Sequence, residues 1–231
     1  RGAGKSYLTA TYTAWRLYCD PDTTILCVSA VQTRAREFIL LVRRLLDSME
    51  ELEHLRPGEW DRDGADRFDV GCRTTPSKNP SVAAYGIKSM ITGTHVDVII
   101  NDDVEIVDNS RTVEARDTLM HRLREFENVL NPGGDIIYLG TPQTEDSVYN
   151  RLAEHYECRR WPARYPNPAD DRQMIRLAPM LLDHLEAETA KPGDPTYPTY
   201  YPDDLLIERE AIMGPSMFAL QMLLDTTLSD A

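Results

Sequence analysis

The sequence predicts an α/β protein, with a mainly parallel sheet flanked by helices and joined to a proline-rich lid or linker subdomain. Strand-like runs alternate with helical patterns through the first 140 residues, which is typical of βαβ units. Between Pro162 and Pro202 lie eight of the 15 prolines, too many for more sheet. A length of 231 residues suits one core with an appended subdomain. We therefore expect a core at residues 1–162 and the subdomain at 163–231.

The first helix is expected over residues 6–19, because apolar side chains recur close to a 3.6-residue period until Asp20-Pro21-Asp22 ends the pattern. These side chains are Leu8, Tyr12, Trp15 and either Leu17 or Tyr18. A β-branched and apolar run at 23–29 predicts a buried strand. From residue 35 to 49, apolar residues at helical spacing predict a second helix that faces the core.

Three further strands and one long helix complete the predicted core. Residues 81–87 predict a short strand, and 96–101 form the clearest buried strand of the chain. A helix is expected from the capping pair Asn109-Ser110 to Leu130, where the Asn-Pro-Gly-Gly sequence at 131–134 would break it. The next strand is expected at 135–139.

The proline-rich stretch is expected to form an extended arm, because proline lacks the N–H group that a sheet ladder needs. It contains one helical pattern, at residues 172–189. The last 30 residues return to helix.

Parallel strands place their carboxyl ends at one rim of the sheet, and ligands bind in the crevice beyond that rim. The predicted elements put Ser6, Asp102 and Thr141 there. We therefore expect the functional residues to come from these three positions and their neighbours.

Net charge, the length of apolar runs and cysteine spacing limit the classes of function that this chain can have. The net charge of −13 argues against a broadly basic nucleic-acid-binding surface, although a small patch can still grip DNA. No apolar run is long enough to span a bilayer, and the start of the chain, which lacks Met and a signal pattern, is interpreted as an internal position in a longer protein. The cysteines lack zinc-ligand spacing and are interpreted as reduced thiols in a cytosol. They are Cys19, Cys27, Cys72 and Cys158.

The sequence Gly4-Lys5-Ser6 at a helix start is the ending of a phosphate-binding loop. In such a loop, backbone amides hold phosphate oxygens, Lys5 reaches the β and γ phosphates, and the Ser6 hydroxyl binds magnesium. The tripeptide alone is a weak signal, because the first glycine of G-x-x-x-x-G-K-[ST] would precede residue 1. The expected ATP-binding residues are Arg1, Gly2, Ala3, Gly4, Lys5 and Ser6.

An apolar strand that ends in acidic residues follows about a hundred residues later, as a Walker B element requires. Asp102 is expected to coordinate magnesium, directly or through water. Asp103 and Glu105 are the candidates to polarise the attacking water, and they would share one face if the chain stays extended. Asp103 is preferred because it directly follows the metal aspartate. The alternative interpretation is an aspartate pair that caps a loop.

Two further residues are candidates for a catalytic role. Arg1 would place a guanidinium on the γ phosphate, or else is an exposed end charge. Thr141, in Gly140-Thr141-Pro142-Gln143-Thr144, would sense the γ phosphate, or else belongs to a simple strand-to-helix turn. Taken together, the motifs predict a P-loop NTPase core of the RecA/ASCE type that uses ATP and Mg²⁺.

The order of these motifs resembles the large terminase subunits of tailed bacteriophages, especially those of short-tailed podoviruses. The resemblance covers nearly the whole chain, and it implies an ATPase motor that drives DNA into the procapsid. It makes Arg1 the phosphate-loop arginine, Asp102 the Walker B aspartate and Thr141 part of the coupling motif. The matching segments are Arg1–Ser6, Val98–Glu105, Tyr138–Thr144, Phe218–Asp225 and Leu228–Ala231, the last two lying where the family passes from ATPase domain to linker and nuclease.

The resemblance also implies partners: double-stranded DNA, a portal protein, a small terminase subunit and further copies of the chain in a ring, expected to be a pentamer. The expected location is the host cytoplasm, with transient docking on the procapsid and no membrane contact. In one departure from the family, its usual Asp-Glu pair is Asp102-Asp103 here, which leaves the water-activating carboxylate open. Nuclease activity is expected only in a further domain that this chain lacks.

Two other functions compete with a terminase ATPase. A nucleotide-binding module that no longer hydrolyses fits the replacement of the family's glutamate by Asp103. A helicase-type DNA translocase would need a second RecA-like domain, for which 231 residues with a proline-rich last third leave no room.

Overall fold

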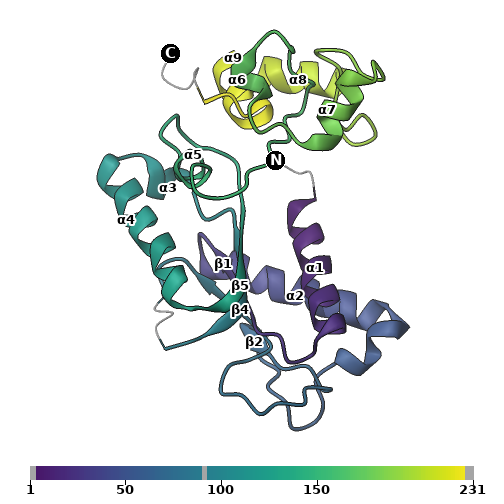
Figure 1. Cartoon of the computed structure of the whole chain (residues 1–231), viewed down its shortest axis with the longest axis vertical. Coiled ribbons are helices and arrows are strands. Elements are labelled where there is room, and N and C mark those ends of the chain that lie inside the picture. The colour runs from purple at the N-terminus through teal and green to yellow at the C-terminus, as the bar shows by residue number, and fades with distance from the viewer. Residues whose placement is uncertain (1–3, 90–92, 227–231) are drawn as a thin grey trace. The chain divides into compact units, whose positions relative to one another are not determined.

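The computed structural model describes residues 4–89 and 93–226, which form two compact units (Figure 1). The first unit contains residues up to 106 together with 117–140, and it holds the sheet. The second contains residues 107–116 and 141–226. The predicted N-terminal α/β core is thus present, while the domain boundary expected after residue 162 stays a prediction.

The sheet of the first unit has five strands in the order β2-β3-β1-β4-β5. All neighbouring pairs are parallel except β2 with β3. The strands are β1 (Ile25–Ser29), β2 (Arg67–Phe68), β3 (Val82–Gly86), β4 (Val96–Asp102) and β5 (Leu130–Leu139). The mostly parallel α/β fold predicted from the alternating pattern is confirmed, and the short antiparallel strand β2 was not foreseen.

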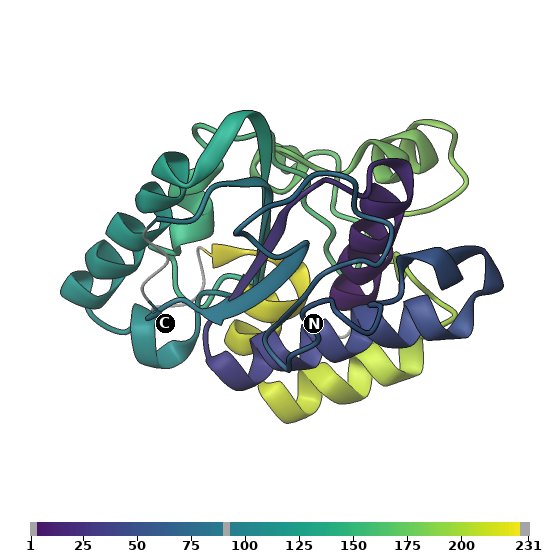
Figure 2. The ribbon, with the colours of Figure 1, turned by 90° about the horizontal axis from the view of Figure 1, so that it is seen from below.

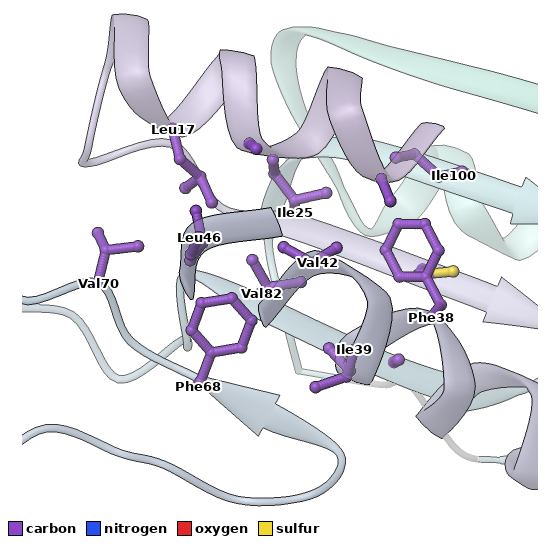
Figure 3. Close-up of a cluster of buried hydrophobic side chains, with 14 of the residues drawn as sticks. Leu17, Ile25, Phe38, Ile39, Val42, Leu46, Phe68, Val70, Val82 and Ile100 are labelled. Carbon is purple, nitrogen blue, oxygen red and sulfur yellow. The ribbon is translucent and has the colours of Figure 1, made fainter. Parts of the chain in front are cut away.

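Burial explains why the central strands are so apolar. Every residue of β1 is buried, and β4 is buried except at Asp97, because helices cover both faces of the sheet. On one face lie α1 (Lys5–Cys19) and α2 (Gln32–Ser48), and on the other lies α4 (Val113–Arg124) (Figure 2). The cluster between the first two helices and the sheet includes Leu17, Ile25, Phe38, Val42 and Ile100 (Figure 3).

The bounds of α1 match the prediction, but its predicted apolar face is confirmed only at Leu17 and, in part, at Tyr12. The helix buries small residues against the sheet and α2, and it leaves Leu8 70% and Trp15 55% exposed. The space beneath most of α1 is already filled by large side chains from α2 and the strands, so the inner face carries small residues except at Leu17. The buried residues of α1 are Thr9, Ala10, Thr13, Ala14 and Leu17.

The long helix expected from Asn109 to Leu130 is divided. It forms α3 (Val107–Ser110), α4 and a 3-10 turn at Glu125–Asn128, and Leu130 already belongs to β5. The Asn-Pro-Gly-Gly segment therefore lies inside a strand. Proline and glycine are tolerated there because β5 is at the edge of the described sheet and its pairing with β4 is irregular near Val96.

The regular structure of the second unit is helical, and the unit builds small apolar clusters around Leu181 and around Phe218. The single helix expected at 172–189 is two helices, because Arg176 between them has φ of +60°. The return to helix near the C-terminus is confirmed up to residue 223. Besides α3, the helices of the second unit are α5 (Val148–Leu152), α6 (Asp171–Met174), α7 (Pro179–Glu186), α8 (Asp203–Met213), α9 (Pro215–Phe218) and the π-helix η3 (Ala219–Leu223).

Over the ranges 4–89 and 93–226, no helix is both long and apolar enough to cross a membrane.

Candidate functional site

The candidate site lies where α1 begins. Gly4 has φ of +75°, a left-handed conformation that glycine adopts without a steric cost, and its carbonyl accepts the first helical hydrogen bond from the Leu8 N–H at 3.0 Å. The helix then runs for 15 residues. Lys5 and Ser6 occupy its first turn, where backbone N–H groups and the helix dipole favour an anion.

Ser6 and Asp102 meet although 96 positions separate them. The Ser6 hydroxyl donates a hydrogen bond to Oδ2 of Asp102 at 2.7 Å. Asp102 is the last residue of β4 and is paired with Ser29 of β1 and Leu139 of β5, so two flanking strands hold its backbone. The two residues expected to bind a metal are therefore brought together by the start of one helix and the end of one central strand.

The environment of Asp102 disfavours its charge. Burial, which leaves the residue 9% exposed, raises the pKa of this carboxyl above its usual value, and the negative charge of Asp103 adds to the increase. The hydrogen bond from Ser6 and the charge of Lys5 oppose it. Within the described parts of the chain, the second oxygen of Asp102, Oδ1, is buried without a hydrogen-bond partner.

These oxygen atoms suit a hard divalent cation. Mg²⁺ prefers oxygen ligands, and it is held by one or two carboxylates together with water and phosphate oxygens. A hydroxyl and a buried carboxylate with an unpartnered oxygen match that requirement. The residues with described positions contain no group of three or more His, Cys, Asp or Glu arranged to hold a metal, so an all-protein metal cage is not formed there.

Asp103 and Glu105 occupy contrasting environments. Asp103 has φ of +46°, so the chain leaves the extended conformation at once and the expectation that both carboxylates share one extended face is wrong. The Asp103 side chain is 57% exposed and lies 3.5 Å from Nζ of Lys5, while its N–H donates to the Leu139 carbonyl. Glu105 is only 2% exposed.

The other predicted site residues are Thr141 and the first three residues of the chain. Thr141 is buried and follows β5 by two residues, but it belongs to the second unit, so its expected place at the rim beside Ser6 and Asp102 stays a prediction. The Thr141 carbonyl accepts a hydrogen bond from the Gln143 amide at 3.0 Å. Arg1, Gly2 and Ala3 lie outside the described residues.

Sequence reasoning missed two buried amides. Asn101 precedes Asp102, is fully buried, and has no hydrogen-bond partner for its side-chain oxygen or nitrogen among the described residues. Gln221 lies in the apolar C-terminal segment and donates to Gln143 at 3.2 Å. The available signals were the position of Gln221 within an apolar run and that of Asn101 directly after one.

Comparison with known proteins supports the resemblance. The chain matches no protein-family model. It is 39% identical, over 238 aligned positions that include the whole chain, to a protein of Enterobacteria phage T3 named "Terminase, large subunit". The chain spans 40% of the length of that relative. The match covers the whole chain, which thus belongs to the family of phage large terminase subunits and corresponds to one part of such a subunit.

Proposed function

We propose that this chain is the ATP-hydrolysing part of a DNA-packaging terminase and couples hydrolysis to the movement of double-stranded DNA into a procapsid. The single observation that carries the proposal is the 2.7 Å contact between Ser6, at the start of α1, and Asp102, at the end of β4. A phosphate-binding loop and a Walker B strand need to meet in this way to hold magnesium-ATP. The relation to the phage T3 large terminase subunit supports the packaging role.

Phosphate binding is assigned to the start of α1. The left-handed Gly4 and the N–H groups of the first turn form a cradle for phosphate oxygens, and Lys5 neutralises charge on the β and γ phosphates. Lys5 lies beside Asp103 in the structure. When ATP binds, Lys5 exchanges this carboxylate for phosphate oxygens, which leaves Asp103 next to the γ phosphate.

Mg²⁺ would be held by the Ser6 hydroxyl and the Asp102 carboxylate, whose Oδ1 has no hydrogen-bond partner among the described residues. When bound, it supplies positive charge that offsets the charge on the phosphate oxygens during transfer. The chain's own contribution is to keep a carboxylate buried and oriented by Ser6 before the nucleotide arrives.

Water activation is assigned to Asp103, with Glu105 as the second candidate. Asp103 is solvent-accessible and lies beside the phosphate-binding Lys5, so a water molecule can reach both its carboxylate and the γ phosphate. Glu105 is almost fully buried and needs a rearrangement of the segment after β4 to reach water. Arg1 is proposed to stabilise the γ phosphate.

Substitution of Lys5 tests the function most directly. In the full-length protein, we expect Lys5→Ala to abolish measurable phosphate release from ATP, because the ammonium that neutralises the phosphates is lost. Lys191→Ala is the matched control, since Lys191 is an exposed lysine of the second unit. Wild-type turnover in Lys5→Ala would reject the phosphate-loop assignment.

Thr141 is proposed to pass the presence of the γ phosphate to the rest of the protein. We expect Thr141→Val to leave nucleotide binding near normal and to lower DNA-dependent translocation, because the substitution removes a hydroxyl and leaves the phosphate loop intact. If Thr141→Val packages DNA and hydrolyses ATP at wild-type rates, residues 140–144 are only a turn and have no role in coupling.

The partners proposed from the family are a portal protein, a small terminase subunit and further copies of the chain in a ring, with the complex docked on the procapsid in the host cytoplasm.

A non-hydrolysing nucleotide-binding module remains the second candidate function, because Asp103 is one methylene shorter than the family's glutamate. It predicts magnesium-ATP binding without phosphate release, with or without DNA. A helicase-type translocase predicts strand separation, which a packaging motor lacks.

A further inference from the structure

We propose that Gln221 is a positioning residue that ties the Gly140–Thr144 loop to the C-terminal helical segment, so that the state of the loop reaches that segment through two side-chain amides in series. This inference rests on the proposed function, in which Thr141 senses the γ phosphate. It adds the residues that carry the signal onward.

The two amides form a directed chain of hydrogen bonds. Nε2 of Gln221 donates to Oε1 of Gln143 at 3.2 Å, and Nε2 of Gln143 donates to the backbone carbonyl of Thr141 at 3.0 Å. All three residues belong to the same compact unit. Gln221 is only 5% exposed, and a buried amide is costly unless it is hydrogen-bonded. A shift of the Thr141 carbonyl therefore changes the hydrogen bonding of a buried residue.

The backbone around Gln221 is unusual. Gln221 is the central residue of the π-helix Ala219–Leu223, and Leu224 after it has φ of +58°. π-Helices are rare and occur frequently at functional sites, and a non-glycine residue in the left-handed region persists only when its surroundings hold it there. The N–H of Asp225 donates to the Ala219 carbonyl at 2.9 Å and closes this turn. An ordinary α-helix would need none of these features.

A second side chain links the same two segments. The Asn150 amide nitrogen lies 2.8 Å from the Glu145 carbonyl and 3.3 Å from the Thr226 hydroxyl. The region just after the loop is thereby joined to the last described residue, independently of Gln221. Two separate contacts thus connect residues 141–145 with the C-terminal segment 219–226.

The loop region is also joined to the segment that follows the Walker B strand. Buried Arg116 forms an ion pair with Asp146 at 3.2 Å and donates to the Ser110 carbonyl at 2.7 Å. Ser110 lies in α3, a few residues after Glu105. Residues 141–146 therefore contact both the segment after β4 and the C-terminal segment, which is the arrangement that a relay between them requires.

The directions of the two hydrogen bonds allow each to be broken separately. Gln221→Met keeps the length of the side chain and removes the donor to Gln143. Gln143→Glu keeps an acceptor for Gln221 but cannot donate to the Thr141 carbonyl when ionised. Gln173→Met in α6 is the matched control, because it makes the same chemical change within the same unit and Gln173 takes no part in the chain of amides.

The experiment uses the full-length protein with double-stranded DNA and procapsids, and it measures magnesium-ATP affinity, basal ATP turnover and the length of DNA packaged per ATP hydrolysed. We expect Gln221→Met to leave affinity, basal turnover and melting temperature close to those of Gln173→Met. We expect the DNA packaged per ATP to fall about 2- to 30-fold, in Gln221→Met and in Gln143→Glu alike. The double variant should be no worse than the more severe single variant, since both changes interrupt one path.

Several results would overturn the proposal. One is a DNA yield per ATP in Gln221→Met equal to that of the Gln173→Met control. Another is additive losses in the double variant, and a third is a parallel loss of basal turnover and thermal stability, which indicates a merely structural glutamine. If Gln221→Met does not fold, Gln143→Glu alone decides through its yield per ATP. If Lys5→Ala still hydrolyses ATP, the proposed function itself is rejected. If Lys5→Ala is inactive and Gln221→Met packages as much DNA per ATP as the control, only the relay is rejected.

Discussion

Two pairs of side chains join the start of α1 to the end of β4, and they differ in nearly every physical respect. Ser6 and Asp102 form a hydrogen bond of 2.7 Å with the carboxylate almost fully buried, whereas Lys5 and Asp103 form an ion pair of 3.5 Å with the carboxylate 57% exposed. The change occurs within one residue, because Asp103 turns into the left-handed region. Adjacent aspartates thus obtain separate environments, one dry enough to favour a cation and one open to water and to exchange of partners.

The largest effect is expected at the buried pair. Asp102→Asn should lower ATP turnover on the order of a thousandfold, because metal charge at the phosphates contributes several kcal/mol to transition-state stabilisation. Single-turnover hydrolysis at saturating magnesium measures it. Asp47→Asn, an exposed carboxylate away from the site, is a suitable control. If turnover falls by less than tenfold, Asp102 does not bind the metal.

The same variant, Asp102→Asn, should also change how the free energy of unfolding depends on pH. Because the pKa of Asp102 is raised in the folded state, the folded protein prefers the protonated carboxyl. The resulting contribution to the free energy of unfolding is fully present below the unfolded pKa of about 4 and is lost as pH rises through the folded pKa. We expect this pH-dependent loss in the wild type without magnesium and a flatter profile in Asp102→Asn, by denaturant titration from about pH 3.5 to 7. Identical profiles would contradict the raised pKa.

A second prediction separates the exposed carboxylate from its buried neighbour. Asp103→Asn should lower single-turnover hydrolysis by about a hundredfold or more while magnesium-ATP binding is retained, because a water-orienting carboxylate typically contributes about 10² to 10⁴ in rate. Glu105→Gln should cost far less. A large loss of hydrolysis rate confined to Glu105→Gln would assign water activation to Glu105 instead. A negligible loss in both variants would favour the non-hydrolysing module.

An intermediate effect is expected from Ser6. Its hydrogen bond lowers the pKa of Asp102, so Ser6→Ala should raise that pKa further and weaken magnesium-dependent ATP binding, whereas Ser6→Thr should retain both. The pKa is measured by NMR titration of the Asp102 carboxyl carbon. An unchanged pKa in Ser6→Ala would show that the 2.7 Å contact has no energetic weight.

The smallest effect is expected for the exposed ion pair as a source of stability. Such pairs contribute about 0 to 1 kcal/mol and are screened by salt. Asp103→Asn should therefore change the free energy of unfolding by less than about 1 kcal/mol, and less again at 1 M salt. A larger stability loss would mean that Asp103 is structural, and its kinetic effect would then need reinterpretation.

Local patterns were sufficient for much of the first unit. The strands β1, β3 and β4 and the two helices α1 and α2 were predicted from apolar runs and helical periodicity, because a parallel sheet covered on both faces needs nearly continuous apolar strands. The same reasoning failed at residues 131–134. Proline and glycine there predicted a break, whereas the edge position of β5 allows them within a strand.

The orientation of α1 shows what periodicity leaves open. Of the predicted stripe, the structure exposes Leu8, Trp15 and Tyr18. It packs Tyr12 and Leu17 against the core and buries small residues beside them. Which side of a helix faces the core depends on the volume that neighbouring elements have already filled. Here Phe38, Val42 and the strand side chains fill it.

The sequence by itself determined the ordering of the motifs, the glycine that begins α1 and the apolar strand that carries Asp102, because each depends on residue types within a few positions of one another. Only the tertiary structure decided that Ser6 meets Asp102, that Asp103 turns away toward Lys5, and that Gln221 reaches Gln143. These contacts join residues between 78 and 98 positions apart. Contacts at such separations are set by how the strands align and how the helices pack on them, which no local pattern encodes.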